Sequence, residues 1–465
     1  MFFFAYFYFE SRKVGGLVSI LSGREVLLEE INEPLEGLGS ISQVSGFFEL
    51  NGQLTCRRCG TSERSKRQAA PCSCGPDCYY CTNCLQMGKI KRCSILYTEK
   101  EQNQFLPLEE PILTWNGTLS RQQQEASKEL VATIEKDGKR LVWATTGAGK
   151  TEMIFKGIEV ALRSKKRICI ASPRVDVCLE LAPRLTSAFQ KVPQVLLYGG
   201  AEESYRYTQL VLATTHQLMR FKQAFDVLII DEIDAFPFHI DETLQFAAQK
   251  AKKDNGSLIY LSATPDKKMQ REIKQGTLAA SILPARYHGF PLPVPHLIWN
   301  GNWQKRIRQK KTTGKFFYCI QQLIAKKRRF LIFLPNIALM QKLAEQLREL
   351  YPDKQFATVY AEDPERKEKV LAMRHENYDW LLTTSILERG VTFKDIDVLV
   401  LGAEDPTFTE AALVQIAGRA GRHRDFPTGT VLFFYYGQTK AIKRAVKQIK
   451  QMNRLAFERG LVEKC

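Results

Sequence analysis

This chain of 465 residues lacks long hydrophobic runs. No segment approaches the roughly eighteen consecutive apolar residues that a membrane-spanning helix needs. The apolar start, MFFFAYFYF at residues 1–9, is too short to span a bilayer, and it lacks the basic region and the small-residue cleavage site of a signal peptide. We therefore expect a cytoplasmic protein in which residues 1–9 form a buried strand or, alternatively, an edge on which a partner docks.

Acidic residues are too few to balance the basic ones. The chain has 67 lysines and arginines against 50 aspartates and glutamates, which leaves a formal net charge of +17. This balance favours a polyanionic partner, either nucleic acid or an acidic membrane surface. A merely soluble basic protein stays open on charge alone. Short-period repeats and low-complexity tracts are also missing, and the length suits two or three domains.

Cysteine is scarce outside one cluster, in which eight of the twelve cysteines fall within residues 56–93. In a reducing cytosol such a cluster favours a metal over disulfides. Two C-x₂-C knuckles, CRRC and CTNC, can supply four thiolates to a tetrahedral Zn²⁺ and leave no position for water. We therefore expect a structural zinc, and its ligands would be Cys56, Cys59, Cys81 and Cys84.

The remaining cysteines need separate interpretations. We expect the four scattered ones to be small apolar fillers or surface thiols: Cys169, Cys178, Cys319 and Cys465. We interpret the four extra cysteines of the cluster as free thiols at the tip of the zinc-binding module: Cys72, Cys74, Cys78 and Cys93. Two zinc ions, an iron–sulfur cluster, or another ligand set in which Cys78 competes with Cys84 stay open.

Apolar runs alternate with helical patterns after residue 110, which predicts βαβ units and parallel sheets. The runs before residue 289 are RLVWATT, RICIAS, QLVLATT, FDVLIID and SLIYLSAT, and those after residue 314 are RFLIFLP, FATVYA, DWLLTTS, DVLVLGA and TVLFFYY. Four prolines and the charged run WQKRIRQKK predict a linker at 284–314. The chain thus divides into an N-terminal region (1–110, with the zinc-binding module at about 54–95), a first α/β lobe (111–289) and a second lobe (290–465) that ends in a basic amphipathic helix.

The stretch ATTGAGKT at 144–151 fits the P-loop pattern, with Ala144 in place of the first glycine. It follows a strand-like run and precedes a helical one, so its N–H groups can surround phosphates at the start of a helix. We expect Lys150 to contact the β- and γ-phosphates and Thr151 to help hold Mg²⁺. The other loop residues expected at the nucleotide are Thr145, Thr146, Gly147, Ala148 and Gly149. An incidental glycine-rich turn is the alternative.

The run FDVLIIDEID at 225–234 ends a hydrophobic strand in two carboxylates, which places them at the sheet edge that faces the P-loop. Asp231 is expected to reach Mg²⁺, and Glu232 to orient and deprotonate the attacking water. The alternative is a helix N-cap. In the second lobe, QIAGRAGRHR predicts a helix with Arg419 and Arg422 on one face, where they can stabilise a transferring phosphoryl group. A solvated basic face is the alternative there.

Together these stretches resemble the superfamily 2 helicases, and further motifs of that superfamily occur in order over residues 119–422. LSRQQ resembles the Q-type motif, with Gln123 as the adenine reader, and SATP at 262–265 resembles the motif that couples hydrolysis to lobe closure. The resemblance implies two tandem RecA-like P-loop lobes with ATP and Mg²⁺ as cofactors. It also implies contacts with the nucleic-acid backbone, for which the candidates are Arg174, Thr214, Thr215, His216, Thr383, Thr384 and Arg389.

A four-cysteine element in front of such a core, with DEIDAFPF, ILERGVT and ALVQIAGRAGRH, is similar to the ComFA family of late-competence proteins over nearly the whole chain. That resemblance implies Zn²⁺ on the four knuckle cysteines. It also implies an ATPase that helps to draw single-stranded DNA through the membrane channel during transformation. The expected partners are single-stranded DNA and other uptake proteins at the inner face of that channel, with peripheral membrane association. Oligomerisation of the chain stays open.

Three other functions stay open on the sequence. One is a replication-restart type DNA helicase, a second is a binding module with a vestigial ATPase, and a third is an RNA-dependent ATPase, because backbone contacts tolerate either nucleic acid. The charge runs KRIRQKK and AKKRR, together with the C-terminal lysines, either line a strand path or form solvated faces.

Overall fold

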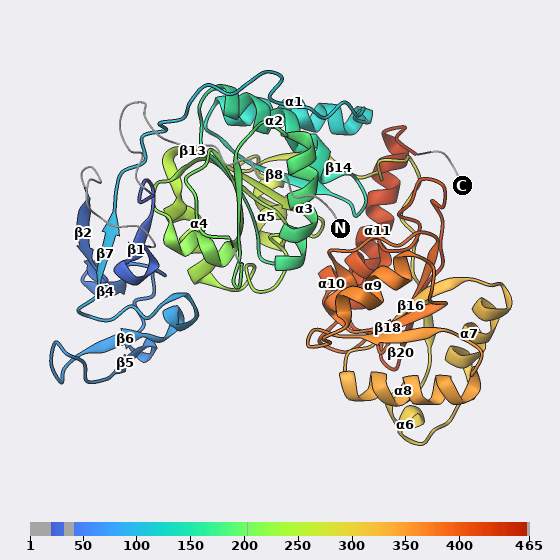
Figure 1. Ribbon diagram of the computed structural model, residues 1–465. Coiled ribbons are helices and arrows are strands. Elements are labelled where there is room, and N and C mark those ends of the chain that lie inside the picture. The colour runs from blue at the N-terminus through green and yellow to red at the C-terminus, as the bar shows by residue number, and fades with distance from the viewer. Residues whose placement is uncertain (1–19, 32–40, 202, 463–465) are drawn as a thin grey trace, which may run out of the picture.

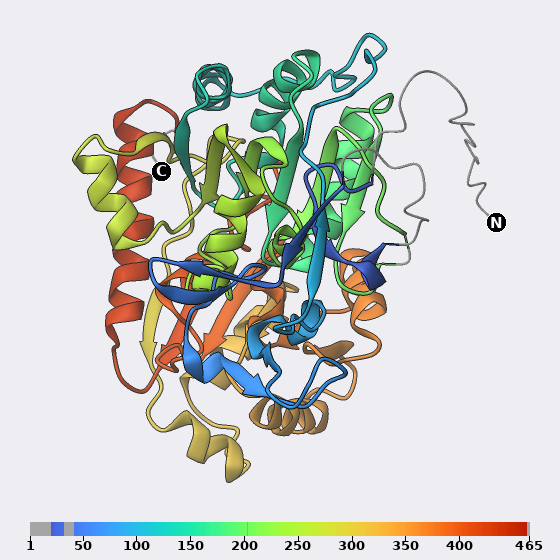
Figure 2. The ribbon, with the colours of Figure 1, turned by 90° about the vertical axis from the view of Figure 1, so that its left-hand side faces the viewer.

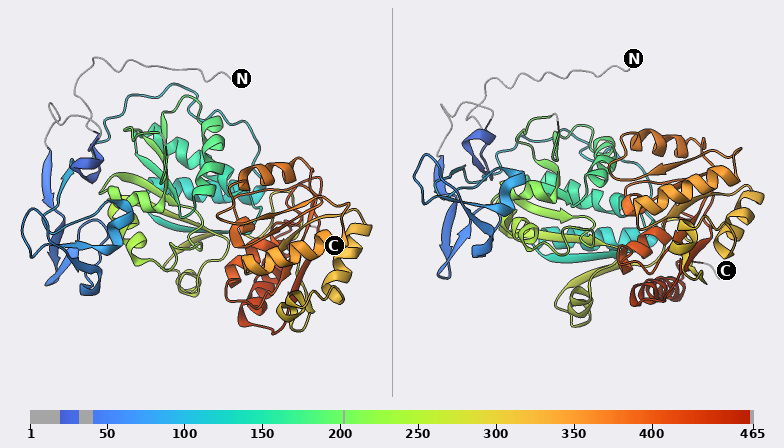
Figure 3. Two further views of the ribbon diagram at one scale, coloured as in Figure 1. Left: turned by 60° about the horizontal axis from the view of Figure 1, so that its bottom comes forward. Right: turned by 90° about the horizontal axis from the view of Figure 1, so that it is seen from below.

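The computed structural model describes residues 20–31, 41–201 and 203–462. Residues 1–9 and Cys465 lie outside these ranges, so the strand expected at residues 1–9 stays a prediction. Three parts follow one another across the molecule: an N-terminal module, a first α/β lobe and a second α/β lobe (Figure 1). Figure 2 views the molecule from the side of the module, and the two views in Figure 3 show the same order of the three parts.

The first lobe is built on a parallel seven-stranded sheet with the order β10-β11-β9-β12-β13-β8-β14. Its strands are β8 (Lys139–Ala144), β9 (Ile168–Ser172), β10 (Gln194–Leu197), β11 (Leu210–Thr214), β12 (Phe225–Ile230), β13 (Lys252–Ser262) and β14 (Ala279–Leu283). Both faces of the sheet are covered: within β12, Val227 and Ile229 enter one hydrophobic core, and Leu228 and Ile230 enter the other. This explains why the strands read as continuous apolar runs rather than as alternating ones.

Helices cover both faces of this sheet (Figure 1). They are α1 (Arg121–Glu135), α2 (Lys150–Arg163), α3 (Val175–Ala188), the 3₁₀ helix η4 (Thr215–Arg220), α4 (Glu242–Ala251) and α5 (Lys267–Lys274). Helices α1, α2 and α3 share one core with the sheet, whereas α4 packs on the opposite face, where the N-terminal module also lies. Every strand pair in this sheet is parallel, so the carboxyl ends of the strands meet at one edge.

The second lobe repeats this architecture with a parallel six-stranded sheet of order β15-β20-β19-β16-β18-β17. Its strands are β15 (His296–Trp299), β16 (Arg329–Phe333), β17 (Phe356–Val359), β18 (Trp380–Thr383), β19 (Ile396–Leu401) and β20 (Val431–Tyr435). Its helices are α6 (Trp303–Arg308), α7 (Lys315–Ala325), α8 (Ile337–Leu350), α9 (Arg366–Arg374), the 3₁₀ helix η5 (Ser385–Glu388), α10 (Glu410–Ala417) and α11 (Lys440–Glu458). The two parallel sheets with flanking helices confirm the predicted fold class.

The C-terminal helix α11 does more than close the second lobe, which is the role expected for it. Gln448 on α11 donates a hydrogen bond of 2.7 Å to the carbonyl of Ala263, which lies in the SATP stretch of the first lobe. Asn453 exchanges two hydrogen bonds of 2.8 Å with the backbone of Leu292 in the segment between the lobes. Helix α11 therefore contacts both lobes and the connection between them.

The N-terminal module consists of small antiparallel pieces: a three-stranded sheet of order β1-β7-β2 and the hairpins β3-β4 and β5-β6. The strands are β1 (Glu25–Leu27), β2 (Ser42–Ser45), β3 (Phe47–Leu50), β4 (Gln53–Cys56), β5 (Arg67–Ala69), β6 (Tyr79–Cys81) and β7 (Ile95–Thr98), and the 3₁₀ helices are η1 (Leu28–Glu30), η2 (Arg64–Lys66) and η3 (Thr82–Met87). Such short elements bury little apolar surface by themselves, so a module of this kind depends on its metal or on its neighbour.

The linker predicted at 284–314 is too long. Its longest stretch without helix or strand is 284–295, because β15 joins the second sheet beside β20 and most of the charged run forms α6. Trp303 and Ile307 on α6 are 2% exposed, which explains why this basic stretch folds as part of the lobe. Strands β10, β14 and β15 were also missing from the sequence prediction, and each has only four or five residues.

Candidate functional site

The P-loop is positioned by β8 on one side and α2 on the other. Gly147 and Gly149 have φ values of 81° and 73°, a left-handed conformation that glycine adopts without the Cβ clash of other residues. The N–H of Thr145 donates to the carbonyl of Leu283 on β14 at 3.0 Å, which fixes the start of the loop. Helix α2 begins at Lys150, so unpaired N–H groups and the positive end of the helix dipole face the same point.

Lys150 and Asp231 form a buried pair at the carboxyl edge of the first sheet. Lys150 Nζ lies 3.2 Å from Asp231 Oδ1. Burial lowers the pKa of Lys150, but the carboxylates of Asp231, Glu232 and Asp234 outweigh burial, and the pKa is raised above its ordinary value. Burial raises the pKa of Asp231, which Lys150 opposes. The pair therefore presents the Lys150 ammonium, which suits a phosphate, beside the Asp231 carboxylate, which suits Mg²⁺.

A cavity of about 500 Å³ lies over the P-loop between the two lobes. Its walls include predicted nucleotide-binding and catalytic residues from both lobes: Gln123, Thr146, Gly147, Ala148, Gly149, Lys150, Thr151, Asp231, Glu232, Arg419 and Arg422. Ala144 and Thr145 are buried behind the loop and do not line the cavity. Several residues of the walls are not predicted from the sequence, including Trp115, Arg184, Tyr287 and Gln415. Gln415, the first residue of QIAGRAGR, is the one among them that a motif could have indicated.

Gln123 is held by the protein itself. Its Oε1 accepts from the N–H of Ser120 at 2.8 Å, and its Nε2 donates to the carbonyls of Ala148 and Gly149 at 3.0 Å each. The side chain thus ties the start of α1 to the P-loop. Adenine recognition by Gln123 stays a prediction, since both ends of its amide already have partners in this arrangement.

The prediction that one helix carries both arginines of QIAGRAGR is wrong. Helix α10 ends at Ala417, and Arg419 and Arg422 follow in a turn in which Gly421 has a φ of 61°. Both side chains nevertheless reach the cavity. Burial, with Arg422 nearby, lowers the pKa of Arg419 to about 9, and burial likewise lowers the pKa of Arg422.

The cavity fits a nucleotide triphosphate with a divalent cation. Arg419 Nη1 and Thr146 Oγ1 are buried polar atoms without a hydrogen-bond partner among the described residues. Arg419 and Arg422, whose positive charge is disfavoured by burial, face the P-loop and Lys150 of the other lobe. An anion with several oxygens would satisfy these groups at once, because buried polar atoms cost free energy when they stay unpaired.

Asp234 is a further residue of this region, and the sequence analysis did not select it. Its carboxylate accepts from Ser262 at 2.8 Å and from Thr264 at 2.6 Å, both in the SATP stretch. Across the cleft, Arg389 Nη2 lies 2.5 Å from Asp234 Oδ2, and Arg389 Nη1 lies 3.3 Å from Glu232 Oε2. Although burial opposes it, Arg389 with its hydrogen bond lowers the pKa of Asp234 to about 2. Asp234 thus joins the SATP stretch to the second lobe.

The predicted DNA contacts lie at the carboxyl ends of strands in both lobes. Thr214 ends β11, with Thr215 and His216 after it, and Thr383 and Thr384 lie at the end of β18. The hydroxyl of Thr383 donates to the carbonyl of Val359 at 2.9 Å, so it is already engaged. Arg174 donates to the carbonyl of Ile386 at 3.1 Å and thus bridges the lobes. For these residues the DNA role stays a prediction.

Arg389 differs from the other candidates because its side chain is only 1% exposed. Three carboxylates surround its guanidinium, those of Glu232, Asp234 and Glu388. The guanidinium of Arg389 is thus held by carboxylates of both lobes in this arrangement, and its contact with DNA or with the ATP side stays a prediction.

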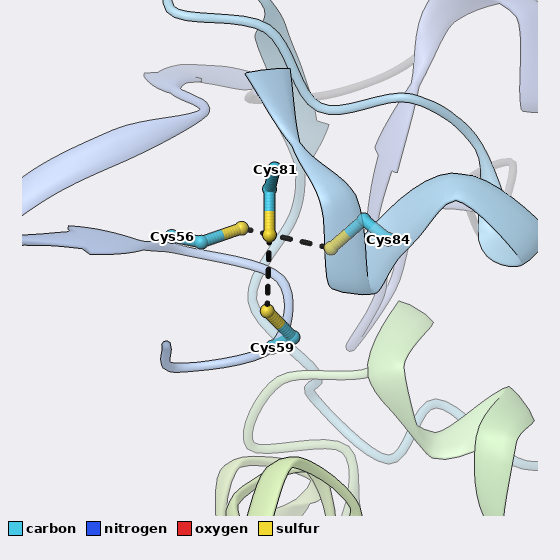
Figure 4. Close-up of side chains that lie close together, drawn as sticks. All are labelled: Cys56, Cys59, Cys81 and Cys84. Carbon is cyan, nitrogen blue, oxygen red and sulfur yellow. Dashed lines mark hydrogen bonds between the residues drawn. The ribbon is translucent and has the colours of Figure 1, made fainter. Parts of the chain in front are cut away.

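The four knuckle cysteines meet at a single point, as Figure 4 shows. Cys56 Sγ lies 3.6 Å from Cys84 Sγ, and Cys59 Sγ lies 3.6 Å from Cys81 Sγ. All four side chains are buried. A tetrahedral zinc with bonds of about 2.3 Å separates its sulfurs by about 3.8 Å, so the four thiols fit the ion with little movement. The extra cysteines Cys72, Cys74, Cys78 and Cys93 also gather in one group, and their interpretation as free thiols stays a prediction.

The knuckles are joined to the first lobe. Lys250 Nζ on α4 donates to the carbonyls of Arg57 and Arg58, at 3.3 and 3.2 Å, between the first two knuckle cysteines. Gly60, directly after Cys59, packs so closely on Phe246 of α4 that an added Cβ would lie 2.5 Å from its ring. The four-cysteine group therefore shapes the surface that docks on the helicase lobe.

Comparisons with known proteins agree with these three parts. Residues 11–98 match the competence protein ComFA N-terminal domain, residues 116–267 match the type III restriction enzyme res subunit, and residues 314–424 match the helicase conserved C-terminal domain. Competence protein ComFA of Bacillus subtilis (strain 168) is 46% identical over 401 residues, 86% of this chain and 86% of that protein. Competence protein ComFA of Streptococcus pneumoniae (strain ATCC BAA-255 / R6) is 38% identical over 409 residues, 87% of this chain and 91% of that protein.

The solved structures include similar folds at low sequence identity. S. cerevisiae Dbp5 bound to RNA and ADP BeF3 superimposes with a TM-score of 0.53 at 15% identity, over 72% of this chain and 88% of that chain. This likeness supports the two-lobe helicase fold alone.

Proposed function

The chain belongs to the ComFA family of competence proteins, and on that premise we propose that it is an ATP-driven motor that moves along single-stranded DNA and assists DNA uptake during transformation. The observation that carries the motor is the cavity between the lobes, in which the P-loop and Asp231 face Arg419 and Arg422 of the other lobe. Because both lobes contribute residues to the site, ATP hydrolysis depends on closure of the cleft between them. Closure also changes the distance between the DNA-binding residues of the two lobes.

Each residue of the cavity has a distinct part in this proposal. The N–H groups of the P-loop and Lys150 bind the phosphates, and Thr151 and Asp231 would hold Mg²⁺, which when bound neutralises phosphate charge. Glu232 orients the attacking water and accepts its proton. Arg419 and Arg422 stabilise the negative charge that develops on the transferring phosphoryl group. Asp234 and Arg389 transmit lobe closure to the SATP stretch.

Single-stranded DNA is the proposed track. Thr214, Thr215, His216 and Arg174 in the first lobe, with Thr383 and Thr384 in the second, supply hydroxyl and basic groups that suit backbone phosphates without base readout. A net charge of +17 supports a polyanionic partner. The zinc on Cys56, Cys59, Cys81 and Cys84 is structural, since four thiolates leave no open position. None of the helices in the described residues has the length and the apolar character of a membrane span. The proposed partners are other uptake proteins at the inner face of the channel.

The test is ATP hydrolysis by the full chain without polymer and with single-stranded DNA, duplex DNA or RNA, with Lys150→Ala as the inactive control. We expect stimulation of at least about tenfold by single-stranded DNA, and loss of at least about a hundredfold in Lys150→Ala, because phosphate positioning is most of the catalysis in this chemistry. Hydrolysis that ignores every polymer, or that survives the Lys150 substitution, would rule out the motor.

Two arms of the same experiment separate the alternative functions. Stronger stimulation by RNA would favour an RNA-dependent ATPase, and stimulation mainly by forked duplex would favour a replication-restart type helicase. The uptake role is tested separately, by following labelled DNA into transformable cells that carry Lys150→Ala. Normal import in those cells would contradict the uptake role without affecting the motor.

A further inference from the structure

The four extra cysteines form a second group at the outer end of the N-terminal module. Cys72 and Cys74 lie in the loop that joins the hairpin strands β5 and β6, Cys78 directly precedes β6, and Cys93 lies in the turn before β7. Their four sulfur atoms all lie within 4.8 Å of one another, although Cys93 is fifteen residues away from Cys78 in the chain. Residues that far apart come together only if the fold brings them there.

Backbone hydrogen bonds hold both loops in place. Cys72 and Gly75 exchange two N–H to carbonyl bonds of 3.2 and 3.0 Å, and Gly75 has a φ of 134°. This turn presents Cys72 and Cys74 on the same side, and the N–H of Cys74 lies 3.4 Å from Cys72 Sγ. The N–H of Arg92 donates to the carbonyl of Tyr79 at 2.8 Å, which fixes the Cys93 turn beside β6.

The sulfur separations match a tetrahedral metal site better than a set of disulfides. Cys72 Sγ lies 3.7 Å from Cys93 Sγ, and Cys78 Sγ lies 3.9 Å from Cys93 Sγ. The edge of a zinc tetrathiolate is about 3.8 Å. Cys72 Sγ and Cys74 Sγ are closer, at 2.8 Å, which lies between the S–S bond of about 2.05 Å in a disulfide and the edge of a zinc tetrathiolate, so one of these two side chains must move to bind the ion.

We propose that Cys72, Cys74, Cys78 and Cys93 bind a second zinc ion, so that the N-terminal module carries two. Four thiolates in a tetrahedral group select a soft ion such as zinc. The two groups share strand β6, because Cys78 precedes it and serves the outer group while Cys81 ends it and serves the inner one. The outer ion would therefore fix the hairpin that aligns half of the inner site.

The two sites differ in exposure. All four inner cysteines are buried, whereas Cys74 and Cys93 are exposed and Cys72 is half-buried. The inner group also packs on α4 of the first lobe, and the outer hairpin β5-β6 extends away from both lobes (Figure 1). Because water and chelators reach exposed ligands more easily, the outer ion exchanges faster than the inner one.

The test measures zinc bound by the full chain at saturation under reducing conditions, with free metal removed and zinc quantified by mass spectrometry. We expect two ions per chain in the wild type, one in Cys74→Ser/Cys93→Ser, and two in the control Cys319→Ser, whose thiol lies on α7 of the second lobe. A wild type that saturates at one ion, or an outer double variant that still binds two, overturns the proposal, and so does iron with sulfide in place of zinc.

A second measurement keeps the proposal testable if a variant folds poorly. Wild-type protein loaded with Co²⁺ reports each tetrahedral thiolate site by its visible absorption, and a chelator added in steps removes the ions in order of access. We expect the absorption of the wild type to decay in two kinetic phases of equal amplitude. The variant Cys74→Ser/Cys93→Ser should lack the faster phase. A single phase in the wild type would contradict a second site.

Discussion

Gly418 of the second lobe lies directly against the P-loop of the first lobe. It follows α10, and a Cβ added there would lie 1.9 Å from Thr146 Oγ1 in the P-loop of the other lobe. No side chain fits in this space, so Gly418→Ala must hold the lobes apart. Overpacking of this kind costs about 1–3 kcal/mol, which corresponds to a loss of about 5- to 160-fold in ATP hydrolysis if all of it falls on the closed, reacting state.

The measurement is DNA-stimulated ATP hydrolysis, with the fold of each variant followed by circular dichroism. Gly437→Ala is the matched control, because an added Cβ there would meet no atom within 4 Å. We expect Gly437→Ala to keep wild-type hydrolysis. An unchanged rate in Gly418→Ala would show that the close approach is unimportant for the reaction.

Asp234 should control closure in a different way, by holding Arg389. The Arg389 side chain is 1% exposed, so Asp234→Asn leaves a buried cation with weaker compensation, a change that typically costs about 3–5 kcal/mol. We expect ATP hydrolysis to fall by at least about tenfold, with the exposed Asp353→Asn as a control that keeps wild-type activity.

The pH dependence of this pair follows from its lowered pKa. Asp234 has a folded pKa of about 2, below its usual value, so its stabilising contribution is present above the unfolded pKa and is lost only as pH falls toward 2. The pair of Asp234 and Arg389 therefore contributes the same amount to the free energy of unfolding from pH 6 to pH 8. A stability difference between wild type and Asp234→Asn that changes across this range would contradict the assignment.

The sequence could predict Lys150, Asp231 and Glu232 because each follows a strand or opens a helix within one short motif. Asp234 could not be found in the same way. Its partners Ser262 and Arg389 lie 28 and 155 positions away. The pairing of β12 with β13 brings Ser262 close, and contact between the two lobes brings Arg389 close. The turn that carries Arg419 and Arg422 was also missed, because the glycines at 418 and 421 end the helix that an i, i+3 spacing suggests.

At the scale of elements, the longest buried strands could be predicted from the sequence, whereas three strands of four or five residues, β10, β14 and β15, could not. β12 and β19 have six residues each, of which five are apolar, as a buried parallel sheet requires. β15 has four residues, all half-buried or exposed, and depends on pairing with β20. The basic run AKKRR illustrates the same limit. Arg328 pairs with Asp395 and Asp397, so part of the run is a structural element and not a free basic surface.

The inner four-cysteine group should stabilise the docking of the N-terminal module on α4. Its cysteines belong to the hydrophobic core shared with the first lobe, so removing the metal leaves four buried thiols around an empty centre. We expect Cys59→Ser/Cys84→Ser to lower the first thermal transition by about 5–10 °C and to increase proteolysis within residues 54–95. Scanning calorimetry measures the transition, and an unchanged Tm would show that docking does not depend on this metal.

At the scale of the whole molecule, charge should govern affinity for DNA. A basic chain that neutralises about five phosphates of a single strand loses about 100-fold in affinity between 50 and 200 mM salt. The exposed basic residues of α11 and of the 325–327 segment add to this field without reading sequence. We expect such a decrease, and equal affinity for mixed-sequence strands, in a fluorescence anisotropy titration. A DNA affinity that does not change with salt concentration would contradict binding through electrostatic contacts with phosphates.

Nucleotide should bring the two lobes together, because groups of both lobes are satisfied only when they face one anion. Arg419 and Thr146 carry buried polar atoms without partners, and they lie on opposite walls of the cavity. A non-hydrolysable ATP analogue should therefore reduce the radius of gyration measured by small-angle scattering in the wild type. Gly418→Ala still binds the analogue through its intact P-loop but cannot bring Gly418 against Thr146, so its radius should stay larger. If both proteins contract equally, the analogue does not act through this contact, and the link between ATP binding and movement of the lobes must lie elsewhere.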